Sequence, residues 1–313
     1  MNIHFKEFFI ELADCSCCPR NCHVDRTKIN SGFCKSDASF KIGSICNHHG
    51  EEPIISGKNG ICNVFFSHCN LQCVYCQNIQ ISKNVQTEVE YKLSFNEIIS
   101  QICHWLDKGC ETVGFVSPSH CIPHIKLIIH TLNEKNYYPT FVYNSNGYDK
   151  VESLKSLEGL IDVYLPDFKY YNSKTAKQFS DANNYPDIAK DALLEMYRQK
   201  GSSIIKNNDG VAVMGLIIRH LVLPEHTSES IQILNWIANN LSTKVHISLM
   251  SQYYPTEKVQ NHPILGKRVE REEYDSVVEA MDKLGFTNGW IQEMQSADNY
   301  QPNFLKAHPF EYL

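Results

Sequence analysis

Three cysteines within one short loop are the clearest sign of chemistry in this chain. Cys69, Cys73 and Cys76 stand in the stretch HCNLQCVYCQN with the spacing C-x3-C-x2-C. Thiolates are the ligands that iron–sulfur clusters select, and three of them this close together can hold one four-iron cube. The fourth iron of such a cube has no protein ligand, and an open coordination position on a metal is where a substrate or cofactor binds. The alternative is a structural zinc site that His68 or a distant cysteine completes.

A second group of cysteines lies nearer the N-terminus. Cys15, Cys18, Cys22 and Cys34 follow the spacing C-x2-C-x3-C-x11-C. Four thiolates at these intervals predict a bound metal, either zinc or a second iron–sulfur cluster. Cys17 adjoins Cys18 and leaves the register of the group open. The surrounding segment has few apolar residues, so a metal would give it the order that a hydrophobic core does not.

The composition describes a folded chain whose thiols are reduced. Its 313 residues include 13 cysteines, an odd number that does not pair completely. Clustered cysteines in a cytosolic protein more often bind metal than form disulfides. We expect a cytoplasmic protein, because charges interrupt the first residues where a signal peptide needs an apolar stretch, and no apolar run is long enough to cross a membrane. The net charge of −6 disfavours nucleic acid as a partner.

These cysteines must be positioned by a framework, and short apolar runs alternate with helical patterns along most of the chain. Strands separated by helices indicate parallel βαβ units. Ser94 followed by Glu97 predicts a capped helix start. About six such units predict an incomplete barrel or an open wound sheet, between which periodicity does not choose. The expected strands cover residues 61–66, 112–116, 139–143, 160–165, 211–218 and 244–250, and the expected helices cover residues 94–108, 121–136, 149–157, a stretch ending near 199, 228–240 and 271–284.

The distribution of cysteines and chain breakers divides the sequence into two regions. Residues 1–58 read as an irregular, cysteine-rich N-terminal extension with breakers such as Pro19 and Gly43, and we expect it to bind metal. Residues 59–313 are expected to form the α/β region, with a C-terminal helix and tail.

The cysteine triplet, with Tyr75 directly before its last member, resembles the radical SAM superfamily. The resemblance covers most of the chain and extends to the PflX-type relatives of pyruvate formate-lyase activating enzymes. It implies a partial (β/α)6 TIM-like barrel, a [4Fe-4S] cluster on the triplet and S-adenosylmethionine (SAM) bound at the open iron. The stretches that carry it are CCPRNC (17–22), GEEP (50–53), FFSHCNLQCVYCQN (65–78), VYLPDFKY (163–170) and LIIRHLVLP (216–224).

Polar residues at the ends of the expected strands are the candidates for binding SAM, because ligands of parallel α/β barrels bind at the carboxyl ends of the strands. The resemblance implies that Tyr75 lies near the adenine. Asn144 can bond ribose hydroxyls, although Asn-Gly pairs such as the one that follows also mark ordinary turns. Asp167 and Lys169 should both point inward by strand alternation, either toward a charged ligand or as a plain salt bridge. Arg219 offers a donor fork for a carboxylate.

The chain departs from the related activating enzymes at the end of its second expected strand. Those enzymes carry a GGE motif there, which contacts the amino group of SAM, whereas this chain has SPSH at residues 117–120. Backbone carbonyls are then the remaining acceptors for that amino group. His220, beside Arg219, is expected to face away from the ligand.

The resemblance implies an oxidoreductase that cleaves SAM to a 5′-deoxyadenosyl radical. That radical would abstract hydrogen, and a glycyl residue of a partner protein is the first candidate for its source. It also implies an electron donor such as flavodoxin or ferredoxin. One alternative keeps the radical chemistry and replaces the partner with a peptide or small metabolite. Another is a non-catalytic iron–sulfur or zinc protein for electron transfer or assembly, which would have no need of polar residues at the strand ends.

Overall fold

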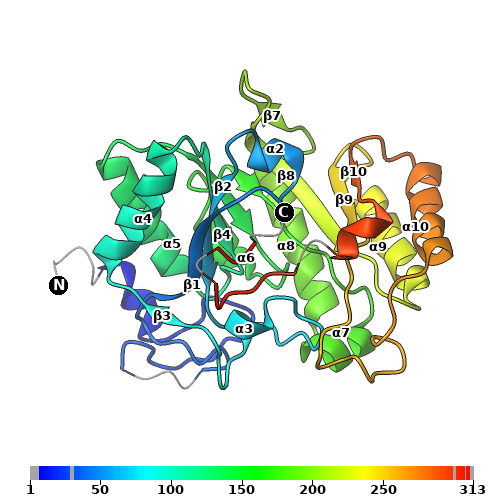
Figure 1. Ribbon diagram of the computed structural model, residues 1–313, viewed down its shortest axis with the longest axis horizontal. Helices are drawn as coiled ribbons and strands as arrows, with labels where there is room; N and C mark the ends of the chain where they lie inside the picture. The colour runs from blue at the N-terminus through cyan, green and yellow to red at the C-terminus, as the bar shows by residue number, and fades with distance from the viewer. Residues whose placement is uncertain (1–6, 29–31, 299–300, 307, 311–313) are drawn as a thin grey trace.

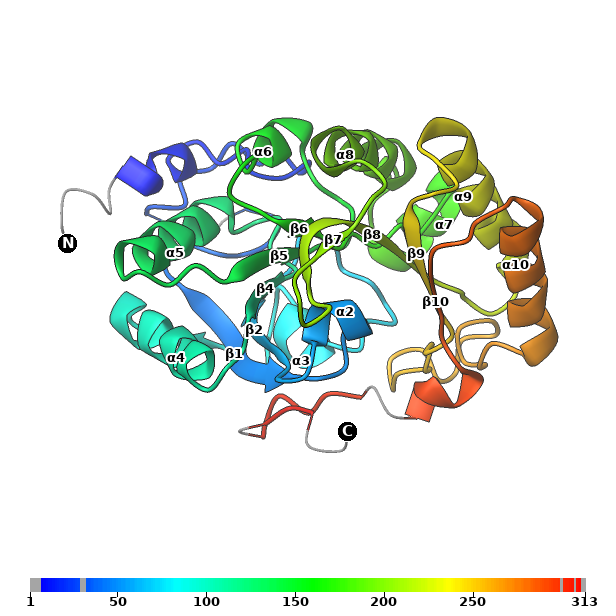
Figure 2. The same cartoon turned by 90° about the horizontal axis from the view of Figure 1, so that it is seen from above.

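A single curved sheet forms the framework of the protein. The structure is a computed structural model that describes residues 7–28, 32–298, 301–306 and 308–310. The strands run in the order β10-β9-β8-β6-β5-β4-β2-β1-β3, and β7 pairs with β8 off this path. Figure 2 shows that the sheet is curved and that its helices lie along the outer side.

Seven neighbouring strands of the sheet are parallel, and three short or peripheral strands are antiparallel to their partners. The parallel strands are β2 (Ile61–Phe66), β4 (Thr112–Val116), β5 (Thr140–Asn144), β6 (Val163–Tyr164), β8 (Ala212–Leu221), β9 (His246–Met250) and β10 (Gly289–Ile291). The antiparallel strands are β1 (Lys41–His48), β3 (Tyr91–Lys92) and β7 (Ile205–Lys206).

The long helices follow the parallel strands in turn and cover the outer face of the sheet (Figures 1 and 2). The long helices are α4 (Phe95–Asp107), α5 (Ile122–Glu134), α7 (Ser173–Ser180), α8 (Tyr185–Lys200), α9 (Thr227–Asn240) and α10 (Arg271–Lys283). The short ones are α2 (Pro53–Ser56), α3 (Ile79–Ser82), α6 (Val151–Lys155) and the 3-10 turns at Ile10–Leu12 and Met294–Asp298.

Local sequence explains several of these boundaries. Every residue of β2 is buried, which is why its run ICNVFF has no polar alternation. The side chain of Ser94 accepts a hydrogen bond from the Glu97 backbone while Glu97 bonds back, so the expected capping box is present at the start of α4. A glycine ends the helix pattern two residues after Asp107, with a positive φ at Gly109.

The expected fold class is confirmed: six βα units run from β2 to α10 and form a partial barrel. β10 is a seventh parallel strand that the sequence analysis missed, because three residues with two of them exposed give no apolar run. Within the described residues β10 and β3 stay unpaired with each other, so the barrel does not close through strand pairing.

The cysteine-rich extension is less irregular than expected. Its residues 41–48 form β1, which pairs with β2 and so joins the sheet. Leu12 and Cys15 are buried in the same hydrophobic core as the barrel strands. The boundary expected at residue 58 stays a prediction. Among the described residues no helix combines the length and apolar character needed to span a bilayer.

Candidate metal and cofactor site

The three cysteines of the triplet lie in the loop between β2 and α3, and each of their sulfurs accepts a hydrogen bond. Such donors to sulfur stabilise thiolates and tune the potential of iron–sulfur clusters. Three separate parts of the chain supply these donors, so only the tertiary structure brings them to the triplet. The contacts are Asn146 Nδ2 to Cys69 Sγ at 3.3 Å, Ser180 Oγ to Cys73 Sγ at 2.9 Å and Ser82 Oγ to Cys76 Sγ at 3.3 Å.

Burial disfavours the ionised form of the thiols of Cys69 and Cys76 and so raises their pKa values. It raises the pKa of Cys69 to about 12, with the neighbouring thiols adding to the effect, and it raises the pKa of Cys76 as well. A metal must therefore displace protons from these sulfurs when it binds. The charge of Cys73 contributes to the raised pKa of both Cys69 and Cys76, so ionisation of one thiol disfavours ionisation of the others.

His68 is engaged elsewhere. Its Nε2 lies 2.5 Å from Glu90 Oε2. This contact uses the nitrogen with which His68 could complete a zinc site with the triplet. Across the described part of the chain, no three Cys, His, Asp or Glu side chains converge tightly enough to hold a single metal ion. A cube does not require such convergence, because its thiolates bind different irons.

Tyr75 belongs to a relay of hydroxyl groups that ends on the triplet. Its hydroxyl lies 2.6 Å from that of Tyr170, which lies 2.6 Å from Ser180 Oγ. Because Ser180 donates to Cys73, the direction of the chain is fixed, with Tyr75 donating to Tyr170 and Tyr170 to Ser180. The ring of Tyr75 packs against Tyr253 and lines the cavity described below. Its expected place beside an adenine is therefore compatible with the structure.

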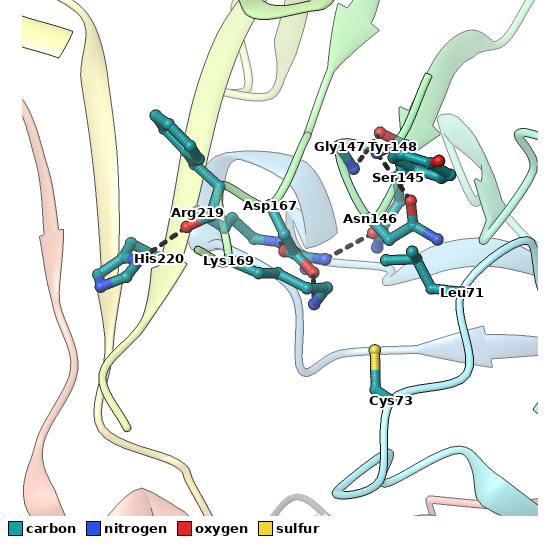
Figure 3. Close-up of polar contacts among 12 residues, drawn as sticks. Leu71, Cys73, Ser145, Asn146, Gly147, Tyr148, Asp167, Lys169, Arg219 and His220 are labelled. Atoms are coloured by element: carbon teal, nitrogen blue, oxygen red, sulfur yellow. Dashed lines mark hydrogen bonds and ion pairs between the residues drawn. The ribbon is translucent and has the colours of Figure 1, made fainter. Parts of the chain in front are cut away.

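Asp167, Lys169 and Arg219 meet at the carboxyl ends of β6 and β8. Asp167 Oδ2 accepts from Lys169 Nζ at 2.6 Å and its Oδ1 accepts from Arg219 Nε at 2.9 Å. Figure 3 shows the three side chains together, with the sulfur of Cys73 directed toward them. His220 lies on the other side of β8, as strand alternation predicts, where its Nδ1 donates to the Phe168 carbonyl.

Mutual attraction keeps these partly buried groups charged. Burial by itself would raise the pKa of the Asp167 carboxyl, but Arg219 and Lys169 hold it below its usual value. Burial also opposes the positive charges, yet Asp167 keeps the pKa of Lys169 and of Arg219 above their ordinary values. The set is therefore a compact array of fixed charges at the barrel end.

The sequence analysis missed Glu51, which completes this array. Its Oε2 accepts from Arg219 Nη1 at 3.1 Å, and its Oε1 accepts from Asn144 Nδ2 at 3.2 Å. Asn144 Oδ1 in turn accepts from Arg219 Nη2 at 2.6 Å. The N–H groups of Arg219 thus donate to the protein's own acceptors. Arg219 therefore holds the side chains of the site in position and has no free pair of donors for a ligand carboxylate. The stretch GEEP, noted only for its resemblance, was the available signal.

Glu52 also lines the site and is buried. Burial raises the pKa of its carboxyl, against the opposing effect of Arg219. Its Oε2 has no hydrogen-bond partner among the described residues. A buried carboxyl with a spare oxygen is a candidate contact for a ligand.

The loop after β5 connects the charged array to the triplet. Asn146 donates to Cys69 Sγ and, at 2.8 Å, to Asn70 Oδ1, so it faces the cysteines while Asn144 faces Arg219. Gly147 has a φ of +77°, and a Cβ there would lie 2.1 Å from the Asp167 carbonyl oxygen. The Asn-Gly pair is therefore a turn that also carries the donor to Cys69 Sγ.

These groups surround one cavity of about 420 Å³, within the range of small-molecule sites. Its wall contains the whole triplet, all five residues predicted to bind SAM and both glutamates. Ser117, from the SPSH stretch, lies at its edge, and Pro302 and Phe310 of the C-terminal tail cover part of it.

The N-terminal cysteines gather at a different place. Cys15, Cys18, Cys22 and Cys34 line one small void of about 10 Å³, together with Cys17. The structure thus brings together all four residues predicted as a second site. Bound metal at these residues stays a prediction.

Comparison with known proteins gives the following similarities. No known family model matches the chain. The solved structures that resemble it include methylornithine synthase (PylB), with a TM-score of 0.49 and 16% identity over 71% of this chain and 62% of that one. A native anSMEcpe structure with bound AdoMet has a TM-score of 0.47 and 12% identity, covering 69% of this chain and 57% of that one. The chain therefore spans less than two thirds of either protein.

An uncharacterized protein of Methanocaldococcus jannaschii, MJ0674, is 32% identical over 275 residues, which are 86% of this chain and 75% of that protein. At this identity and coverage, the chain belongs to the same protein family as the M. jannaschii protein.

Proposed function

We propose that this protein is a radical SAM enzyme. One observation carries the proposal: three hydrogen-bonded cysteines and a partly buried array of fixed charges share the wall of one cavity of about 420 Å³. An electron carrier has no use for such a cavity, and a structural zinc site leaves no open coordination position. The resemblance of the sequence around Cys69–Cys76 to the superfamily points the same way.

The residues present fit the expected groups. Cys69, Cys73 and Cys76 would hold the [4Fe-4S] cluster, and their three donors would support its thiolates. When bound and reduced, the cluster supplies the electron that cleaves SAM to methionine and a 5′-deoxyadenosyl radical. A flavodoxin or ferredoxin is the proposed source of that electron.

The chain's own residues would bind and orient SAM. Tyr75 packs at the cavity wall for the adenine, while Asn144, Asp167, Lys169 and Arg219 hold a charged, hydrogen-bonding surface beside the triplet. Glu51 keeps Arg219 and Asn144 in position from the opposite side. Because the array is ordered before any ligand arrives, little of the binding energy is lost to arranging it.

We further propose that the hydrogen comes from a glycyl residue of a partner polypeptide. The barrel does not close through strand pairing in the described residues, and Figure 2 shows loops and the C-terminal tail on the open side of the sheet. Pro302 and Phe310 of that tail line the cavity. A loop from a partner can approach where an eighth strand would otherwise stand. A free peptide or small metabolite is the rival substrate for the same chemistry.

Anaerobic reconstitution with iron, sulfide, SAM and a reductant tests the core of the proposal. The wild-type protein should form 5′-deoxyadenosine and methionine. Cys73→Ala should lose both the cluster absorbance and SAM cleavage by more than about 100-fold, because loss of even an outer partner of a ligand costs 10–100-fold. Cys103→Ala, a matched change in α4 away from the cavity, should retain both.

Two results would decide the remaining questions. An intact cluster that yields no 5′-deoxyadenosine would remove the radical SAM proposal. With cleavage established, a glycyl-radical EPR signal in an added partner enzyme would support the activating function. Cleavage without that signal in any glycyl-radical enzyme would favour the peptide or metabolite substrate.

A further inference from the structure

We propose that Cys15, Cys18, Cys22 and Cys34 bind one thiophilic metal ion, Zn²⁺ by their ligand chemistry, and that this ion fastens the N-terminal extension to the loop that carries Cys69. Four thiolates around one ion form a closed site with no open position. The site is separate from the cavity of the proposed function and does not depend on that function being correct.

Two turns present the four cysteines to one another. In the first, Cys15 and the segment at residues 23–24 exchange backbone hydrogen bonds, and Asn21 N–H donates to the Cys18 carbonyl. In the second, Lys35 N–H donates to the Gly32 carbonyl and so turns the chain around Cys34. Cysteines separated by two to four residues are typical of zinc sites, and Cys15, Cys18 and Cys22 have such spacings.

The two turns also contact each other through sulfur. Phe33 N–H donates to Cys22 Sγ at 3.3 Å, so the first turn accepts a hydrogen bond from the second. A Cβ on Gly32 would lie 3.5 Å from Cys22 Sγ, which shows how closely the turns approach. Backbone donors to sulfur are expected where the sulfur is a thiolate ligand.

The environment of Arg26 is a second argument that the N-terminal cysteines carry negative charge. Its guanidinium is 1% exposed, and within the described residues no carboxylate lies at ion-pair distance from it. It donates instead to the carbonyls of Ser36 and His120 and, at 3.6 Å, to Cys15 Sγ. A buried charge without a counter-charge is costly. Four thiolates on a divalent ion carry a net negative charge that would neutralise it.

The size of the void favours a single ion over a cluster. About 10 Å³ is room for roughly one water-sized sphere, and a cube with its sulfides is several times larger. The four thiols do not yet converge on one point, so uptake of the ion has to turn their sulfurs inward.

The same turns are fastened to the loop of the triplet. Asn84 Nδ2 donates to the carbonyls of Phe33 at 3.0 Å and Cys69 at 2.9 Å, and Asn84 Oδ1 accepts from Cys69 N–H. Arg20, between Cys18 and Cys22, donates to the Asn70 carbonyl at 2.9 Å. An ion that orders the turns thereby orders the backbone next to Cys69.

Metal analysis of anaerobically purified full-length protein tests the proposal, with zinc and iron counted separately. We expect about one zinc per chain and four sulfurs at about 2.3 Å in zinc X-ray absorption. Cys18→Ser and Cys34→Ser should lower zinc affinity by at least roughly tenfold. Cys103→Ser should keep the zinc, and Cys73→Ala should lose iron but keep zinc.

Three outcomes would overturn the assignment. They are wild-type protein that binds no zinc after incubation with it, zinc with fewer than four sulfur neighbours, and iron that survives in Cys73→Ala but disappears when Cys18→Ser is added. The absorption measurement uses wild-type protein, so it decides the matter even if the cysteine variants do not fold. The zinc count also separates this proposal from the proposed function, which is judged by iron and 5′-deoxyadenosine.

Discussion

Two groups of buried or partly buried cysteines lie close together in this protein but in opposite surroundings. The triplet at Cys69–Cys76 borders a cavity of about 420 Å³, whereas the N-terminal four surround a void of about 10 Å³. The triplet faces a set of matched charges with room for a ligand, and the N-terminal group faces Arg26, for which the described residues supply no carboxylate partner. Cysteine spacing is similar in both, so the space beside the thiols separates an expected catalytic centre from an expected structural one.

The largest effect should appear when one cysteine is removed from each group and the stabilities of the two variants are compared. Cys18→Ser should lower the free energy of unfolding by at least about 3 kcal/mol, because the binding energy of a structural metal is folding energy. Cys73→Ala loses the cluster instead, but hydrogen bonds from Asn146 and Asn84 also hold its loop, so we expect a smaller loss than for Cys18→Ser. Denaturant titration of the wild-type protein and both variants, prepared with the same zinc and iron supply, measures the difference, and equal losses would erase the distinction between the sites.

Next in size is the loss of the central acid of the charged array. Asp167→Asn leaves Lys169 and Arg219 buried with less compensation, and SAM affinity should fall about 10- to 100-fold. Isothermal titration with SAM measures this directly. Asp209→Asn, in an exposed turn, is the matched control and should bind SAM like wild-type protein. Unchanged affinity in Asp167→Asn would remove this residue from the binding surface.

A smaller effect should follow from cutting the link between the two cysteine groups. Asn84→Ala removes the amide that joins the Cys69 backbone to Phe33 and leaves buried groups unpaired. We expect a loss of about 1–3 kcal/mol in unfolding free energy and faster release of iron on dilution. Asn235→Ala, on the outer side of α9, should stay within about 0.5 kcal/mol. Iron release at the wild-type rate would show that the groups are independent.

A further effect, which depends on pH, concerns acid stability beside the N-terminal extension, where His124 is buried. Burial, assisted by the charge of Arg26, lowers the pKa of His124 to about 3, although Asp37 opposes it. The unfolded chain binds the proton near pH 6.5, so stability present above that pH is lost as the pH falls toward 3, by up to about 1.4 kcal/mol per pH unit. His124→Gln can keep the donor to the Ala38 carbonyl without titrating, and should flatten that slope between pH 6.5 and 5. Parallel curves for both proteins would contradict the assignment.

Local signals in the sequence located most of the framework. The apolar run of β2 and the capping box of α4 were both predicted to within one residue of the observed bounds. Less was recovered where strands are short. The expected strand at 160–165 is paired only over Val163–Tyr164, and β10 escaped notice because its three residues owe their conformation to pairing with β9.

The site divides in the same way. Cys69, Asp167 and Arg219 could be singled out because their residue types and strand-end positions are local properties. Glu51 could not, because its role depends on Arg219, which lies 168 residues away in the chain. Asn84 and Ser180 were missed for the same reason: an asparagine or serine is ordinary until the fold places it against a sulfur or a backbone group.

By itself the sequence determined which thiols lie within reach of one another, where helices begin and which strands are buried, since each of these follows from spacing and periodicity over a few residues. Only the tertiary structure decided which cysteine group has free volume beside it, which acids neutralise Arg219 and which buried cation has none. Those properties arise when distant segments of the chain meet in the protein interior. There the low polarity makes an unpaired charge costly, and a cavity exists only where the surrounding side chains do not fill the space.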